Sequence, residues 1–168
     1  AGDLTDVFHN TPLRETLPLA LQDWSLAAGT LDGRLVLRWP LAADGAEPRL
    51  SAQGRIEDAT LRSATLPVEA SGLTGDFAYE LARGLEMEHL NGRLLGAPIE
   101  GSIASDGPRT RVRVEGDVSV ERLRHLAGPA LLREASGHLG YEARVVIPRD
   151  GGRVQMDLSS PLTGLALE

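Results

Sequence analysis

The sequence predicts a mostly-β protein with two short helices, built as a curved antiparallel sheet. Apolar and polar residues alternate with a period of two in at least five segments, and turn-forming residues separate these segments at short intervals. Such short intervals indicate hairpins between antiparallel strands rather than helices between parallel strands. With 168 residues and 42% hydrophobic content, the chain can form one ordinary domain, or one compact piece of a larger protein, with a real core.

Two segments have apolar residues at helical spacing. The first, residues 12–24, is expected to form a helix with Thr11 as its N-cap and Pro12 at its first position. Its apolar positions are Leu13, Leu17, Ala20, Leu21 and Trp24. The second, residues 120–134, has Ser119 as its expected cap, and Gly128-Pro129 is expected to split it into two pieces. Its apolar positions are Leu123, Leu126, Leu131 and Leu132.

The strand expected over residues 31–39 shows the clearest alternation. One of its faces is apolar and the other is charged, which is typical of a half-buried strand. Further alternating segments cover residues 50–56, 73–81, 112–118 and 154–158. The expected turns between strands are Asp44-Gly45, Ser71-Gly72, Asn91-Gly92, Asp106-Gly107-Pro108 and Asp150-Gly151-Gly152.

The sequence also contains an internal similarity. Residues 29–40 align without a gap with residues 137–148, and in each copy an expected helix precedes a long strand that ends in proline. Repeats of this kind are typical of elongated architectures in which each unit packs against its neighbours. We therefore interpret residues 1–168 as one fragment of a longer repetitive protein, with a first repeat at about 11–118 and the start of a second at about 119–168.

Composition and charge argue against several functions. The formal net charge is -7 and all 17 basic residues are arginine, so the chain lacks the basic excess expected of a nucleic-acid binder. No apolar stretch approaches the roughly 20 residues that span a bilayer, so we expect no membrane insertion by this fragment. The chain has no cysteine, and His9, His89, His125 and His138 are isolated from one another in sequence.

We therefore expect no enzyme activity, no cofactor and no metal site. The carboxylates Glu86 and Glu88 share one face of an expected strand, where a water-facing role is more typical than a catalytic pair. Gly92, Gly96 and Gly101 are not followed by a predicted helix, so they indicate turns or bends in the sheet rather than a phosphate loop.

The apolar strand faces are the candidate functional surface. These faces either line an open groove for acyl chains or form the closed core of a sandwich or barrel, and periodicity alone favours the closed core. The candidate groove residues are Leu31, Leu35, Leu37, Trp39, Phe77, Tyr79, Leu139, Val145 and Ile147.

Five short motifs follow one another along the chain: Thr11-Pro12-Leu13, residues 29–35, residues 90–99, residues 116–123 and residues 157–167. Taken in this order, they resemble the repeat region of the YhdP branch of the AsmA-like and TamB-like periplasmic bridge proteins. The resemblance implies a long periplasmic parent protein that is anchored in the inner membrane of a Gram-negative bacterium. It also implies repeats that form a groove-like antiparallel sheet, along which phospholipid tails move between the inner and outer membranes.

The expected function is thus passive shielding of phospholipid acyl chains, with flanking repeats of the same chain as partners. One alternative is a structural or assembly module of the envelope, with a closed core and sheet edges that pair with partners. A second is a carbohydrate-binding β domain, which would need aromatic residues on a wet face. Only two Trp, two Tyr and two Phe are available for such a face.

Overall fold

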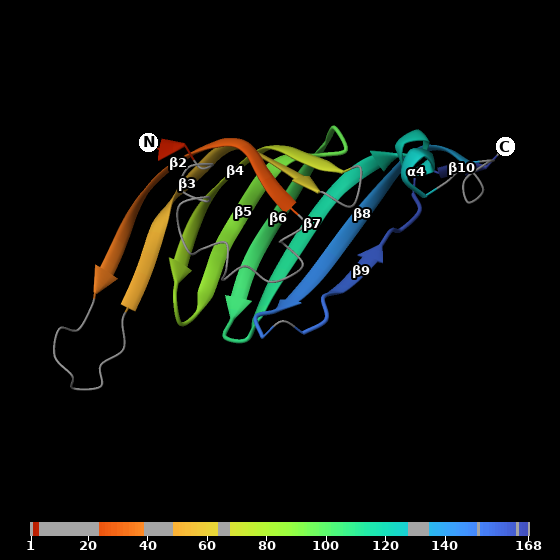
Figure 1. Ribbon diagram of the computed structural model, residues 1–168. Coiled ribbons are helices and arrows are strands. Elements are labelled where there is room, and N and C mark those ends of the chain that lie inside the picture. Colours follow the sequence, from red (N-terminus) through yellow and green to blue (C-terminus); the bar gives the residue numbers. More distant parts are fainter. Residues whose placement is uncertain are drawn as a thin grey trace.

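The computed structural model describes residues 2–3, 24–38, 49–63, 68–127, 135–150, 152–163 and 165–167. Within this part of the chain, ten strands form one antiparallel sheet that does not close on itself, and one short helix accompanies it (Figure 1). The strands are β1 (Gly2–Asp3), β2 (Trp24–Arg38), β3 (Arg49–Ser63), β4 (Glu69–Glu80), β5 (Gly84–Leu94), β6 (Ala97–Asp106), β7 (Arg109–Ser119), β8 (Ala135–Pro148), β9 (Gln155–Ser159) and β10 (Leu165–Leu167).

The strands pair in the order in which they occur in the chain, from β1 to β8. At the far edge of β8, two separate strands pair with different parts of the same strand. Strand β9 pairs with residues 142–146, and β10 pairs with residues 135–137. The expected mostly-β, antiparallel class is therefore confirmed, whereas the expected groove and repeat units remain predictions.

Two of the expected turns are strand interior instead. Ser71-Gly72 lies within β4 and Asn91-Gly92 within β5. The expected turn at Gly107-Pro108 is confirmed between β6 and β7. The turn between β5 and β6 was not anticipated. It is formed by Leu95 and Gly96, whose φ angles of 54° and 74° suit the two central positions of a tight hairpin. Asp44-Gly45 lies outside the described residues.

The described residues contain a single helix, α4 (Val120–Ala127), rather than the two expected helices. The second expected helix is thus present over its first eight residues, and Ser119 accepts a hydrogen bond from the Arg122 N–H at 3.4 Å, as an N-cap does. The rest of it lies outside the described residues, as do residues 12–23 of the first. Trp24 belongs to β2, which corrects its assignment to a helix. No described helix has the length and apolarity to span a membrane.

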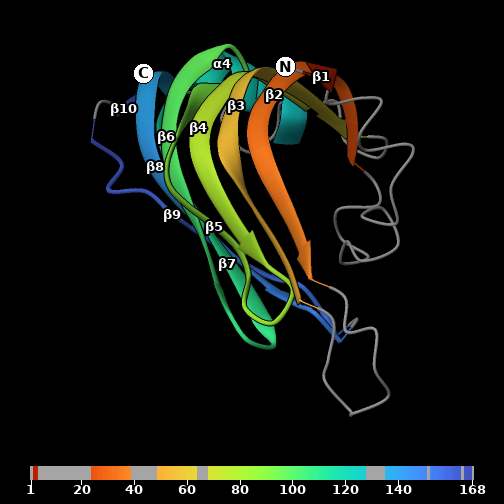
Figure 2. The same ribbon diagram turned by 90° about the vertical axis from the view of Figure 1, so that its left-hand side faces the viewer.

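Irregular pairing bends the sheet. The register shifts between β2 and β3, between β3 and β4, between β4 and β5, and between β5 and β6. Gly29, Asp58 and Gly72 lie at or beside these shifts and have positive φ angles. An extra residue on one strand of a pair bends that strand and increases its twist. Figure 2 shows the strands bending along their length, with α4 on the inner side of the bend.

Buried side chains gather in two clusters on the inner side. One is formed by Ala59, Ala70, Leu73 and Ile99, with partly buried neighbours from β2 to β8. The other lies beneath α4 and is formed by Val118, Val120, Ala135 and Leu139. Val120 is only 1% exposed and fixes the start of the helix against the sheet. Among the described residues, Met87 and Ile147 are also buried, at 3% exposed each, outside these two clusters.

Candidate functional site

The apolar side chains of the sheet share one face. Directly paired residues point to the same side of an antiparallel sheet, so the register defines rows that cross the strands. One row joins Leu35, Ala52, Tyr79 and Leu85 across β2 to β5. A second joins Met87, Ile103, Val112, Val145 and Met156 across β5 to β9. The described strands therefore present one continuous apolar face, which we call the apolar face.

Much of the apolar face is not covered by other described residues. Leu35 and Leu37 on β2 are 67% and 59% exposed, and Met156 and Leu158 on β9 are 67% and 63% exposed. These four side chains lie toward the two edges of the sheet, with partly buried Phe77, Tyr79 and Val145 among the strands between them. Exposed apolar patches of this kind mark binding surfaces in soluble proteins.

Eight of the nine sequence-predicted groove residues lie on the apolar face, and Trp39 lies outside the described residues. The eight differ in accessibility. Leu139 and Ile147 are only 6% and 3% exposed, so they support the face from within and offer little surface to a ligand. Leu31, Phe77, Tyr79 and Val145 are partly buried, whereas Leu35 and Leu37 are exposed.

Met156 and Leu158 belong to this surface although they were not among the predicted groove residues. Their alternation predicts a strand, but the sequence does not say which strand pairs with β9. The register places Met156 beside Val145 and Leu158 beside Ala143. These pairings extend the apolar face by one strand beyond β8.

The family model described as YhdP protein matches residues 1–168, the whole of the chain. The chain belongs to the YhdP family. Neither the curated proteins nor the solved structures contain a significant match. The apolar face described above is therefore a feature of a YhdP-family sheet.

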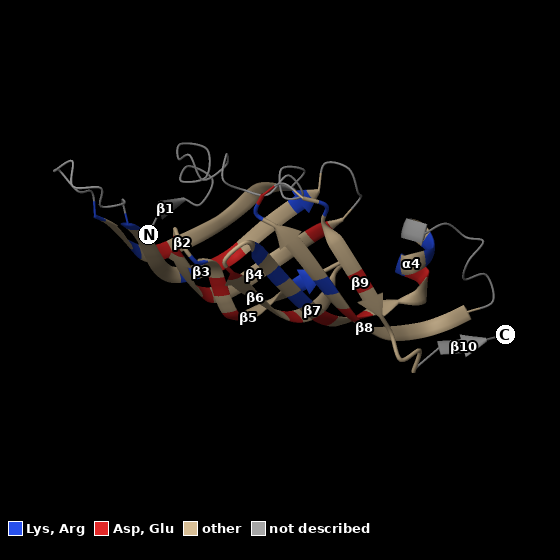
Figure 3. Ribbon diagram, turned by 90° about the horizontal axis from the view of Figure 1, so that it is seen from below, with Lys and Arg blue, Asp and Glu red and all other residues tan. Residues whose placement is uncertain are grey.

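The opposite face of this YhdP-family sheet is charged, and Figure 3 shows acidic residues and arginines spaced along the strand ribbons. Arg55 pairs with Glu57 at 3.2 Å and with Asp76 at 3.1 Å. Glu142 accepts hydrogen bonds from Arg144 at 2.5 Å and from Arg113 at 2.8 Å, and these bonds hold the pKa of its carboxyl below its ordinary value. Exposed ion pairs of this kind contribute little stability, about 0–1 kcal/mol each, and are typical of a solvated surface.

The residues considered for catalysis or metal binding are dispersed over the YhdP-family chain. His89, His125 and His138 are exposed on three different elements, β5, α4 and β8, and His9 lies outside the described residues. Glu86 and Glu88 are exposed on β5. Among the described residues, no group of three or more metal-ligating side chains comes together.

Tyr141 has the most distinctive environment on the apolar face. It is paired with Gly116, and its hydroxyl lies 3.2 Å from the position that a Cβ of Gly116 would occupy. Its ring contacts both buried clusters, so it joins the bend to the helix corner. Partial burial, with a smaller contribution from the Asp117 carboxylate, raises the pKa of the Tyr141 hydroxyl above its ordinary value of 10.0.

We expect Tyr141 to titrate above 10.0 in the folded chain. Because a raised pKa favours the protonated form in the folded state, the associated stability is present below pH 10.0 and is lost as the pH rises toward the pKa of the folded state. Tyrosinate absorbance of the Tyr79→Phe variant reports Tyr141 alone, since the chain has two tyrosines. A reversible midpoint at or below 10.0 in the folded variant would contradict this assignment.

Proposed function

We propose that this chain is a non-catalytic segment of a periplasmic lipid-transfer bridge, which shields phospholipid acyl chains between the inner and outer membranes. The observation that carries the proposal is the apolar face of the sheet, which is open and single-layered over the described residues, with Leu35, Leu37, Met156 and Leu158 exposed on it. Membership of the YhdP family supports the same role.

Burial of hydrocarbon surface provides the driving force for this binding. Each Å² of apolar surface removed from water contributes roughly 25 cal/mol, so an acyl chain lying across several strands gains several kcal/mol. The polar residues Ser105 and Thr110 also point to this face, but their hydroxyl groups bond to each other at 2.9 Å. Ser105 additionally bonds to the Leu85 backbone, so these groups do not need a polar ligand.

The bend of the sheet supports a groove rather than a flat binding surface. Since α4 lies inside the bend and packs against Val118 and Leu139 of the apolar face, that face is on the concave side (Figure 2). In the proposed parent protein, flanking repeats continue this groove in both directions. The positive φ angles at Gly29 and Gly137, equivalent positions of the two similar segments, support a repeating unit.

The proposal is tested by native mass spectrometry of the chain purified from bacterial membranes or loaded with phospholipid. We expect bound phospholipid in the unmodified chain and about a tenfold or greater loss in the Leu35→Asp/Leu158→Asp variant, because a carboxylate beside an acyl chain loses its hydration. Both residues are exposed, so the substitutions are expected to leave the fold intact.

A matched control places the same two charges on the opposite face. The Gln53→Asp/Gln155→Asp variant alters exposed residues that point to the charged side of β3 and β9, so we expect it to retain lipid. An unmodified chain that binds no phospholipid and takes up no fluorescent fatty acid would contradict the proposal. The alternative hypothesis, an envelope assembly module that binds partners through its sheet edges, would then be favoured.

A further inference from the structure

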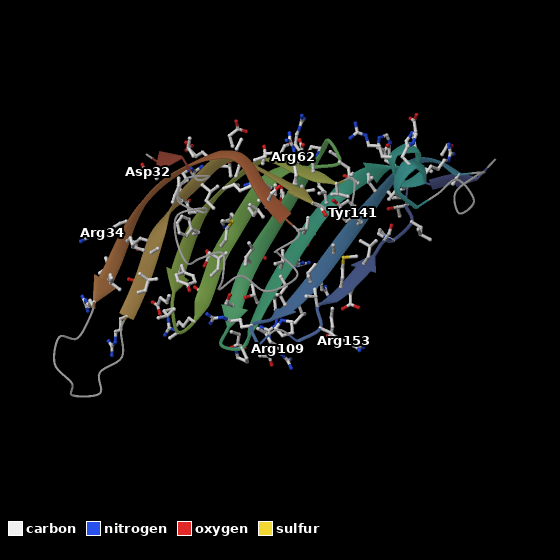
Figure 4. All side chains as sticks on the ribbon, viewed as in Figure 1. Asp32, Arg34, Arg62, Arg109, Tyr141 and Arg153 are labelled. Carbon is white, nitrogen blue, oxygen red and sulfur yellow. The ribbon has the colours of Figure 1, made fainter. Side chains whose placement is uncertain are left out.

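Tyr141 places a hydroxyl group among apolar side chains in the middle of β8 (Figure 4). Leu139 and Ala143, two residues away on either side, point to the same apolar face. An added Cβ on Gly116 would lie 3.2 Å from the Tyr141 hydroxyl and 2.9 Å from the Ile99 Cγ2. Because Gly116 has no side chain, the hydroxyl comes close to the β7 backbone, beside apolar atoms of β6.

The Tyr141 hydroxyl has no hydrogen-bond partner within the described part of the chain. The Pro98 carbonyl oxygen also lies 3.0 Å from the Cβ position at Gly116, yet no hydrogen bond joins it to the hydroxyl. The Ser105 and Thr110 hydroxyls on the same face, by contrast, bond to each other at 2.9 Å. None of the described side-chain polar atoms is both fully buried and unpartnered, so the Tyr141 hydroxyl is accessible to a ligand.

A ligand that covers the apolar face removes water from this hydroxyl. A hydroxyl that loses its hydration without gaining a new partner costs free energy, and this cost opposes binding of the ligand. A saturated hydrocarbon chain offers no hydrogen-bond acceptor. A ligand that places an acceptor oxygen beside Tyr141 therefore binds better than one that places only methylene groups there.

The charges near Tyr141 favour a neutral acceptor. Partial burial, with a smaller contribution from the Asp117 carboxylate, raises the pKa of the Tyr141 hydroxyl, so the group stays protonated and can donate. The same carboxylate repels an anionic group, and the net charge of -7 on the chain acts in the same direction. An ester carbonyl oxygen is a neutral acceptor, and a diacyl lipid carries one at the start of each acyl chain.

We propose that the Tyr141 hydroxyl donates a hydrogen bond to an ester carbonyl oxygen of a bound diacyl lipid. This inference rests on the proposed function and adds a specificity-determining residue to it. The hydrogen bond fixes the position of the ester on the sheet, and the acyl chain continues from there over the apolar face. A lipid with ether-linked chains offers the same hydrocarbon surface but lacks the carbonyl oxygen.

The test compares dioleoylphosphatidylglycerol with its diether analogue, in which ether linkages replace the two esters. We expect the unmodified chain to retain the diester about two- to tenfold better than the diether, the effect of one hydrogen bond. The Tyr141→Phe variant is expected to lose this preference, because it should retain less of the diester and the same amount of the diether. Native mass spectrometry with each lipid gives the bound fraction.

The matched control is Tyr79→Phe, which makes the same substitution at the other tyrosine of the apolar face. Tyr79 lies one residue before the end of β4, at the border of the sheet, and its variant is expected to keep the preference for the diester. Urea denaturation of both variants should give the midpoint of the unmodified chain, which shows that a change in lipid retention does not come from unfolding.

The outcomes separate this inference from the function on which it rests. Equal retention of diester and diether by the unmodified chain overturns the hydrogen bond and leaves acyl-chain binding intact. A Tyr141→Phe variant that keeps the preference, or that loses both lipids equally, overturns the role of the hydroxyl. Loss of the preference in Tyr79→Phe overturns its assignment to Tyr141. An unmodified chain that binds neither lipid overturns the function and the inference together.

Discussion

Replacing Gly54 with alanine is expected to lower the free energy of unfolding by about 1–3 kcal/mol or more. Gly54 on β3 is paired with Gly33 on β2, and the two backbones approach very closely. A Cβ at position 54 would lie 2.2 Å from the Asp32 carbonyl oxygen and 2.6 Å from the Gly33 Cα. Because both contacts are with backbone atoms, no side-chain rotation relieves them and the β2–β3 ladder must shift.

A second glycine gives the matched control. Gly140 lies in the middle of β8, and an added Cβ there would meet only the Asp117 Oδ1, at an ordinary 3.4 Å. We expect Gly140→Ala to be neutral or stabilising by up to about 1 kcal/mol, because alanine loses less backbone freedom on folding. Urea denaturation of both variants measures the difference in their free energies of unfolding. Equal urea midpoints would show that the close backbone approach at Gly54 does not affect stability.

The second large effect is expected at Ile99. This side chain is 5% exposed and packs with Ala59, Ala70 and Leu73 in the cluster at the bend. Truncation to alanine removes buried methyl groups and leaves a cavity, so the free energy of unfolding should fall by about 2–5 kcal/mol. The bend would lose part of its support, since this cluster joins strands from β2 to β8.

Met156→Ala provides the comparison on the same face. Met156 is 67% exposed, so its truncation should change the free energy of unfolding by less than about 0.5 kcal/mol. The difference between the two changes in the free energy of unfolding distinguishes residues that stabilise the sheet from residues that are exposed to a ligand. A destabilisation by Met156→Ala as large as that by Ile99→Ala would mean that the exposed edge is packed in solution.

Strand content could be predicted from the sequence because period-two alternation is a local signal. Leu35 and Leu37 alternate with Arg34 and Arg38, and the same logic identifies β3, β4, β7 and β9. Glycine positions predict turns less well, because glycine occurs both in turns and inside strands. Gly72 and Gly92 were expected in turns but lie in strands. Gly92 is partly buried and closely approached, since an added Cβ would lie 2.6 Å from the Leu73 Cδ2.

The features missed from the sequence depend on three-dimensional pairing. Leu95 adopts a positive φ angle that is rare for leucine, so nothing in its identity indicates a turn. Leu139 is buried in the cluster beneath α4 and Ile147 is 3% exposed, whereas Leu35 is 67% exposed. All three lie in strands with the same alternation, so the alternation does not distinguish buried from exposed positions.

The pairing of strands in chain order has a consequence for how the molecule unfolds. Each strand from β2 to β7 has its ladder partners immediately before and after it in the chain, so stability is close to a sum of nearest-neighbour couplings. In such a linear array, fraying starts at the ends and advances inward one strand at a time. Amide hydrogen exchange is therefore expected to be fastest in β9 and slowest in the central strands β4 to β6. Additional repeats on either side would pair with the edge strands, so that these strands would lie inside a longer sheet and would no longer fray first.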